Sequence, residues 1–119
     1  MRAGALHDRR DGRCVVPRVW KAERAWDRLR GLLGRPALGA GEGLLIDPCR
    51  TVHTFGMRYP LDLAFLDRDG RVRKLAYGVV PGRLAGSRAA QATLELAAGT
   101  LASSGIALGD VVDWRESDR

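Results

Sequence analysis

The sequence has few of the features that would place it in a specialised class of protein. It contains only two cysteines, Cys14 and Cys49, and this pair forms neither a disulfide framework nor a CxxC redox motif, so we expect two free thiols. No apolar run approaches the roughly 18 to 20 residues that cross a bilayer. Residues 1–13 lack the apolar core of a signal peptide, and we therefore expect a cytoplasmic protein.

Aromatic residues are also scarce, although the chain is strongly basic. The net charge is +6 with a pI near 10.3, but only seven aromatic residues (three Trp, two Tyr, two Phe) are available to stack on bases. Most basic residues are arginines scattered among acids, and the densest group lies at Arg2, Arg9, Arg10 and Arg13. We expect residues 1–12 to be a flexible basic N-terminus. The pattern favours a solvated basic surface over a nucleic-acid groove.

The remaining composition is that of a globular protein, with 45% hydrophobic and 29% charged residues. We expect one compact domain over residues 13–114 and a frayed tail over 115–119. One amphipathic helix is predicted at about 21–33, because Trp26, Leu29 and Leu33 share a helical face and Gly34 follows.

Short strands account for most of the other predicted elements. Residues 13–20 predict an edge or bulged strand because Pro17 cannot donate to a ladder. Residues 61–67 and 71–80 form a predicted hairpin around Asp69-Gly70. Further strands are expected at 43–47, 51–55, 92–98 and 110–114, with a loop at 81–91 and a helical turn at 100–104. The fold class is therefore α+β: a mostly antiparallel curled sheet or partly closed β-barrel, with the main helix after the first strand.

Cys49, His53 and Met57 are spaced by four residues, as soft copper ligands on a helix would be. Thr51, Val52 and Thr54 favour extended backbone instead, and residues four apart in a strand lie about 13 Å from each other. We therefore expect no bound metal and no cofactor. The same spacing disfavours His53 as the base for a Cys49 nucleophile.

Asp62 and Glu95 each lie in an otherwise apolar strand, within LDLAFL and TLELAA. A buried carboxylate needs a partner, and Arg58 is the candidate for Asp62. The two carboxylates are either separate structural groups or parts of one polar pocket, and the pattern leaves both readings open.

Four segments, HTFGMRYPLDLAFLDRDGRV, GLLGRPAL, LELAAG and GIALGDVV, together resemble the domain of unknown function 192 family of bacteria and archaea. The resemblance runs from about Cys14 to Trp114. It implies a compact β-rich domain with a helix after the first strand, and it brings no established activity. Many members have Trp before the motif Met and Lys-Asn after it. Gly56 and Arg58-Tyr59 occupy those positions here, so a pocket at Met57 would be more open.

Three functions are compatible with these residues. The first is a small cytoplasmic binding or accessory domain whose pocket accepts a small molecule or a peptide segment. The second is a hydrolase-type enzyme in which His53 acts with Asp62 or Glu95. The third is an arginine-mediated nucleic-acid accessory protein. The candidate pocket residues are His53, Phe55, Met57, Arg58, Asp62 and Glu95, with Cys49 and Asp110 as additional candidates.

Overall fold

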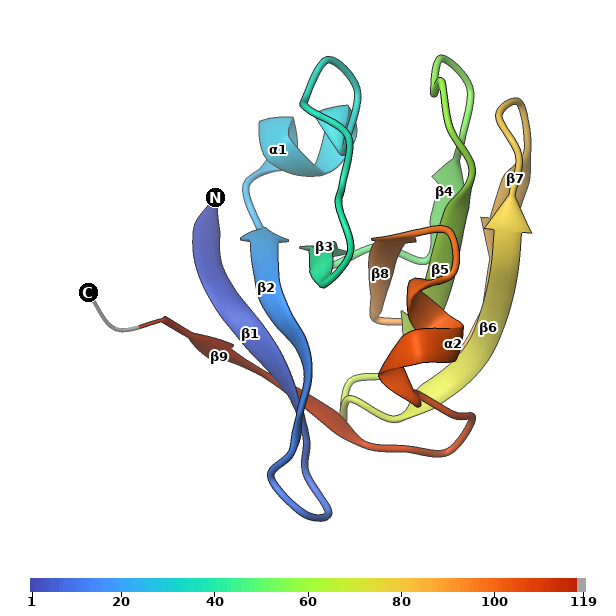
Figure 1. Cartoon of the computed structure of the whole chain (residues 1–119). Helices are drawn as coiled ribbons and strands as arrows, with labels where there is room; N and C mark the ends of the chain where they lie inside the picture. The colour runs from blue at the N-terminus through green and yellow to red at the C-terminus, as the bar shows by residue number, and fades with distance from the viewer. Residues whose placement is uncertain (118–119) are drawn as a thin grey trace.

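Within residues 1–117, seven strands form one sheet and two short strands form a second. The computed structural model describes residues 1–117 (Figure 1). The order in the large sheet is β6-β5-β8-β3-β2-β1-β9, and every neighbouring pair is antiparallel except β2 and β3. Its strands are β1 (Arg2–Asp8), β2 (Cys14–Ala22), β3 (Glu42–Ile46), β5 (Leu61–Leu66), β6 (Val72–Val79), β8 (Ala92–Ala97) and β9 (Val112–Glu116). The small sheet pairs β4 (Thr51–His53) with β7 (Leu84–Gly86).

Strands β5 and β8 are almost entirely buried, because both faces of the sheet are covered around them. Every residue of β5 is buried, as the apolar pattern of LDLAFL predicts. Leu61, Leu63 and Phe65 belong to one apolar cluster, whereas Ala64 and Leu66 belong to another on the opposite face. The predicted hairpin is present, since β5 and β6 pair around a turn in which the Gly70 N–H donates to the Asp67 carbonyl.

The sheet is open, so the partly closed barrel is not found. The two outermost strands, β6 and β9, are linked by an isolated bridge between Arg71 and Val111 rather than by a ladder. The fold is mostly β with two short helices, α1 (Ala25–Arg30) and α2 (Thr100–Ser104). Over residues 1–117, no helix has the length and apolar character that crossing a bilayer requires.

The predicted helix over 21–33 is wrong in its extent and in its buried face. Helix α1 has six residues and buries none of them; Trp26 is 69% exposed and Leu29 is 74% exposed. The chain leaves the helix at Gly31, which adopts a positive φ of 54°. Leu32 is thereby directed into the core instead, where it is 6% exposed.

The predicted flexible N-terminus is also wrong, because residues 2–8 form β1 between β2 and β9. Leu6 is fully buried in this strand. Gly4 permits the close approach of β9, since an added Cβ would lie 2.6 Å from the Trp114 ring. This pairing joins the two ends of the chain, and local sequence patterns do not report such distant partners.

Two further expectations need correction. The tail is ordered as far as the structure describes it, since β9 runs to Glu116 and the Ser117 N–H donates to the Ala3 carbonyl; residues 118–119 of the expected frayed tail lie outside the described residues. The segment 81–91 is not all loop, because it contains β7.

Pro17 lies where the register of β2 against β1 shifts, which agrees with the bulge that its sequence position predicts.

Candidate functional site

Glu95 is the most unusual polar group in the core. It lies in β8 between Leu63 of β5 and Leu44 of β3, and only 5% of it is exposed. Its Oε1 atom has no hydrogen-bond partner among the described residues. Burial raises the pKa of this carboxyl from 4.5 to about 7. An unpartnered buried carboxyl is costly to the fold, and such groups are rare in native structures.

A cavity of about 180 Å³ lies against Glu95. Gly31 helps to leave this space open, because an added Cβ there would lie 3.7 Å from Glu95 Oε1. The lining comes from α1 and the turn after it, from β3, from the segment around β4, and from β8: Arg28, Leu29, Arg30, Gly31, Leu32, Leu33, Ile46, Cys49, Thr51, Val52, His53, Met57 and Glu95.

The structure brings Cys49, His53 and Met57 to this one cavity, although an extended strand would separate them. The chain turns back after β4, where Gly56 has a φ of 83° and the Met57 N–H donates to the Thr54 carbonyl at 3.2 Å. Within residues 1–117, however, no three His, Cys, Asp or Glu side chains are grouped as metal ligands would be.

The cysteine and the histidine do not form a catalytic pair. The Cys49 thiol donates to the Thr51 carbonyl at 3.4 Å, and its burial raises its pKa, so it stays protonated at neutral pH. His53 is exposed and stacks on Phe55, with the ring centroids 5.6 Å apart. In the described part of the chain, His53 forms no hydrogen bond to either Asp62 or Glu95.

Asp62 does not belong to the cavity, so the shared pocket with Glu95 is not formed. Its Oδ1 accepts a hydrogen bond from the Gly78 N–H at 2.8 Å. Its Oδ2 accepts from the N–H groups of Gly99 and Leu101 at 2.9 and 3.0 Å, at the start of α2. The expected ion pair with Arg58 is absent within residues 1–117. Backbone donors therefore take the place of that partner.

The other candidates lie at or beyond the edge of the cavity. Arg58 lines a neighbouring hollow together with Met57 and Tyr59. Asp110 is distant, and its Oδ2 accepts from the Ala107 N–H at 2.9 Å within a turn, as a capping residue does.

Sequence reasoning missed Arg28, Arg30 and Gly31, which line the cavity from α1 and the residue after it. Gly31, the first glycine of GLLGRPAL, was the available signal, because the helix ends there and the cavity lies beside it.

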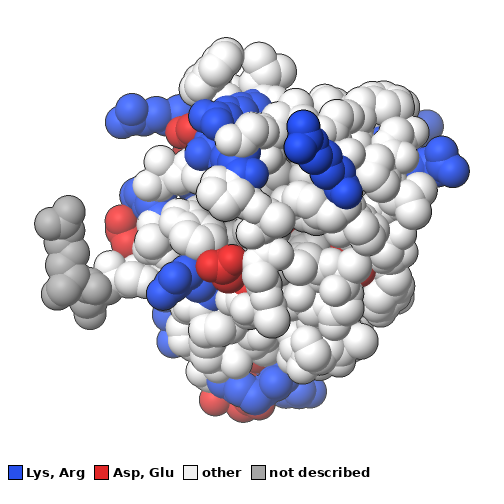
Figure 2. All heavy atoms as spheres, turned by 45° about the horizontal axis from the view of Figure 1, so that its top comes forward, with Lys and Arg blue, Asp and Glu red and all other residues white. Residues whose placement is uncertain are grey.

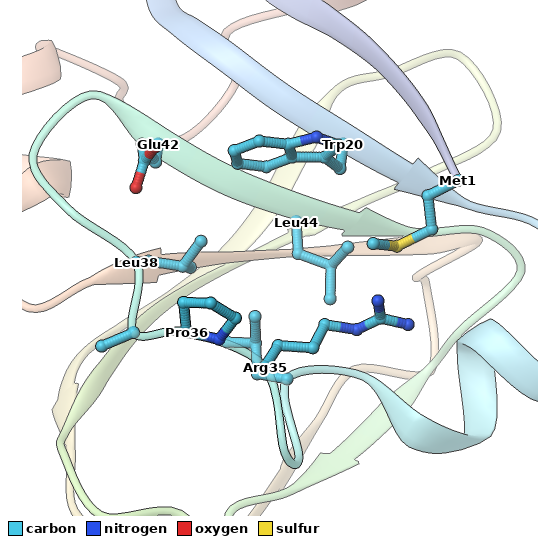
Figure 3. A pocket seen from close by; sticks show the side chains of 9 residues that line it. Met1, Trp20, Arg35, Pro36, Leu38, Glu42 and Leu44 are labelled. Atoms are coloured by element: carbon cyan, nitrogen blue, oxygen red, sulfur yellow. The ribbon is translucent and has the colours of Figure 1, made fainter.

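A second cleft, of about 240 Å³, lies on the other side of Leu32. Figure 3 shows the Trp20 ring facing Pro36 and Leu38 across it, with Leu44 between them. The two charged side chains at this cleft are already engaged: Arg35 bonds to Asp27 and the Gly31 carbonyl, and Glu42 accepts from the Gly39 N–H. Among the described residues that line this cleft, no side chain has a buried polar atom without a partner, in contrast to the Glu95 cavity.

The fold and its cavity define a small, mostly β protein. Its main sheet is open, and the buried carboxyl of Glu95 shares a cavity with residues of the short helix α1. The chain belongs to the domain of unknown function 192 family, described as Uncharacterized ACR, whose model matches residues 6–114 and confirms the resemblance seen in the sequence. A search of curated proteins found no match.

Two solved structures are similar to this one. A protein from Sinorhizobium meliloti, described as a candidate transcription regulator, is 27% identical with a TM-score of 0.79, over 95% of this chain and 92% of that one. A protein of unknown function from Novosphingobium aromaticivorans is 26% identical with a TM-score of 0.74, over 94% of this chain and 84% of that one.

Proposed function

We propose that this protein is a binding domain that accepts a small molecule in the cavity beside Glu95. One observation supports this above all: Oε1 of the buried Glu95 carboxyl has no hydrogen-bond partner within residues 1–117, and Glu95 lines a cavity that has room for a ligand. More than nine in ten buried polar groups in proteins are hydrogen-bonded, so an exception at a cavity marks a place for a ligand. A ligand that donates a hydrogen bond would complete the coordination of Glu95.

Binding is favoured over hydrolysis by the positions of the titratable groups. A general base needs an orienting partner within hydrogen-bond reach, and His53 has neither Asp62 nor Glu95 as such a partner. The raised pKa of Cys49 leaves little thiolate for a nucleophilic attack.

A fragment screen followed by ¹H–¹⁵N NMR tests this proposal. The probes are small amines, amides and alcohols, compared on the wild type, on Glu95→Leu and on the control Glu42→Gln, whose side chain lies outside the cavity. We expect amide shifts at Gly31, Cys49 and Met57 that Glu95→Leu abolishes and Glu42→Gln retains. Shifts centred elsewhere, or binding that Glu95→Leu leaves unchanged, would contradict the proposal.

Nucleic-acid binding is the second candidate, because the Sinorhizobium relative is described as a candidate transcription regulator. Nucleic-acid binding has less support than small-molecule binding, because several arginines already form ion pairs with carboxylates. Arg2 pairs with Glu23 and Glu116, and Arg9 pairs with Asp113. On the face drawn in Figure 2, Lys and Arg lie in separate groups, several of them beside carboxylates. A mobility-shift titration with mixed-sequence duplex DNA tests this candidate. A shift at low salt that weakens steeply as the salt rises would support phosphate-mediated binding, and the absence of a shift at low salt would contradict it.

A further inference from the structure

We infer that the ligand of the Glu95 cavity is a short amino carboxylate, with its ammonium group on Glu95 and its carboxylate on Arg28 and Arg30. This inference rests on the proposed function and specifies the ligand's chemistry. It follows from the presence of one unpartnered acceptor and two unneutralised cations on the wall of the same cavity.

The inner end of the cavity requires a hydrogen-bond donor. Glu95 lies between two neighbouring strands, where the buried residues Leu44 of β3 and Leu63 of β5 flank it. An ammonium group satisfies Oε1 and also favours the ionised carboxyl. A second carboxylate placed there would be repelled, so the acidic end of a ligand must point away from Glu95.

The outer end carries two positive charges that the fold orients without neutralising. The Arg28 guanidinium donates to the carbonyls of Glu23 and Pro48 at 3.1 and 3.4 Å. The Arg30 guanidinium donates to the carbonyls of Leu33 and Gly34 at 2.8 and 3.1 Å. Each guanidinium has five N–H donors, so both retain donors for an incoming carboxylate.

The nearest acids on the same segment do not cancel these charges. Asp27 pairs with Arg35 at 3.1 Å, and Glu23 pairs with Arg2 and Lys21. In the described chain, no carboxylate forms an ion pair with Arg28 or Arg30. Both side chains are half-buried, and their attraction for an anion is therefore less screened than that of an exposed arginine.

The rest of the lining combines apolar side chains with Cys49, Thr51 and His53, and the cavity is small. Ile46 and Val52 are buried along it, and Met57 packs against the same cluster. A volume of about 180 Å³ admits a short alkyl chain with one polar group at each end. These features together favour an amino carboxylate over a purely apolar, purely cationic or purely anionic ligand.

Isothermal titration calorimetry with matched probes tests the inference. The amino carboxylates are β-alanine, 4-aminobutanoate and 5-aminopentanoate, and the single-group controls are pentylamine and pentanoate. We expect at least one amino carboxylate to bind roughly tenfold or more tightly than either control, because each end adds a charge-assisted contact. If no amino carboxylate exceeds both controls, the inference is wrong.

Variants assign each end of the ligand to its partner. Glu95→Gln should remove the advantage over pentanoate, and Arg28→Gln combined with Arg30→Gln should remove the advantage over pentylamine. Glutamine keeps a donor for the backbone carbonyls that these arginines hold. The control Arg24→Gln changes a neighbouring exposed arginine outside the cavity lining and should leave every affinity unchanged.

Failure of the inference can be separated from failure of the proposed function. If pentylamine binds as tightly as the amino carboxylates, shifts the Gly31 and Met57 amides and depends on Glu95, the cavity is a ligand site but the carboxylate assignment is wrong. If the probes shift amides on another face, both the inference and the proposed function are overturned.

Discussion

Asp62 and Glu95 lie on neighbouring strands but point to opposite faces of the same sheet. Asp62 is paired with Leu96, and Glu95 is paired with Leu63, which is the next position along the strands. Paired residues share a face and successive residues alternate between faces, so the two carboxyls point in opposite directions. Asp62 accepts three backbone hydrogen bonds, and Oε1 of Glu95 accepts none from the described residues. Two carboxyls in similar apolar strands therefore have different surroundings: backbone N–H groups hold Asp62, whereas Glu95 is the carboxyl that we propose a ligand binds.

Asp62→Leu should destabilise the protein by about 3 kcal/mol or more. The change leaves the N–H groups of Gly78, Gly99 and Leu101 without their acceptor, and Leu101 is buried. Asp62→Asn retains one oxygen acceptor and should lose less. Urea denaturation measures both variants, and an Asp62→Leu protein within about 1 kcal/mol of wild type would show that the carboxylate is not structural.

The wild type should lose stability as the pH rises from about 4.5 to about 7, by about 3 kcal/mol relative to Glu95→Gln. Below this window Glu95 is protonated in both the folded and the unfolded state. Within it, the unfolded chain releases the proton while burial keeps it on the folded protein, so the folded state binds more protons and stability falls. Denaturant melts at several pH values measure the difference, and parallel curves for the two proteins would exclude the shifted pKa.

Leu29→Ala should change the free energy of unfolding by less than about 0.5 kcal/mol, whereas Leu32→Ala should cost about 2 to 4 kcal/mol. Leu29 is 74% exposed on α1, while Leu32 is 6% exposed in the core. Denaturant melts of this matched pair test where the chain turns inward after Gly31. Equal losses for the two variants would mean that α1 packs against the sheet.

Iodoacetamide should alkylate Cys14 before Cys49. Cys14 is exposed, while Cys49 is half-buried with a pKa raised by that burial, so less of its thiol is present as thiolate. Peptide mass spectrometry over a time course reports both sites, and Cys14→Ser isolates the slower one. Faster labelling of Cys49 than of Cys14 would indicate an activated thiol in the cavity.

Local patterns predicted the central part of the fold. The segments LDLAFL and ATLELAA were predicted as strands because each is apolar enough to be buried in a sheet. The hairpin was predicted because the turn at Gly70 joins two strands that are adjacent in the sequence. The prediction failed where partners are distant. Strand β1 is fixed by β9 from the other end of the chain, and the apolar stripe of α1 is interrupted because Gly31 turns Leu32 inward.

Only part of the candidate site could be predicted from the sequence. Glu95, His53, Met57 and Cys49 were among the candidate pocket residues, and all four line one cavity, which Met57 reaches because the chain turns at Gly56. The role of Asp62 could not be predicted, since its partners Gly99 and Leu101 are backbone groups 37 and 39 residues away. No side-chain pattern encodes such a contact.

A ¹³C NMR titration of the Glu95 side-chain carboxyl is the most direct test of the binding site proposed here. A buried carboxyl without a partner should titrate with a midpoint near pH 7, in keeping with its raised pKa. A midpoint at or below the ordinary value of 4.5 would show that Glu95 is solvated or already paired, and the cavity would then have no free acceptor for a ligand.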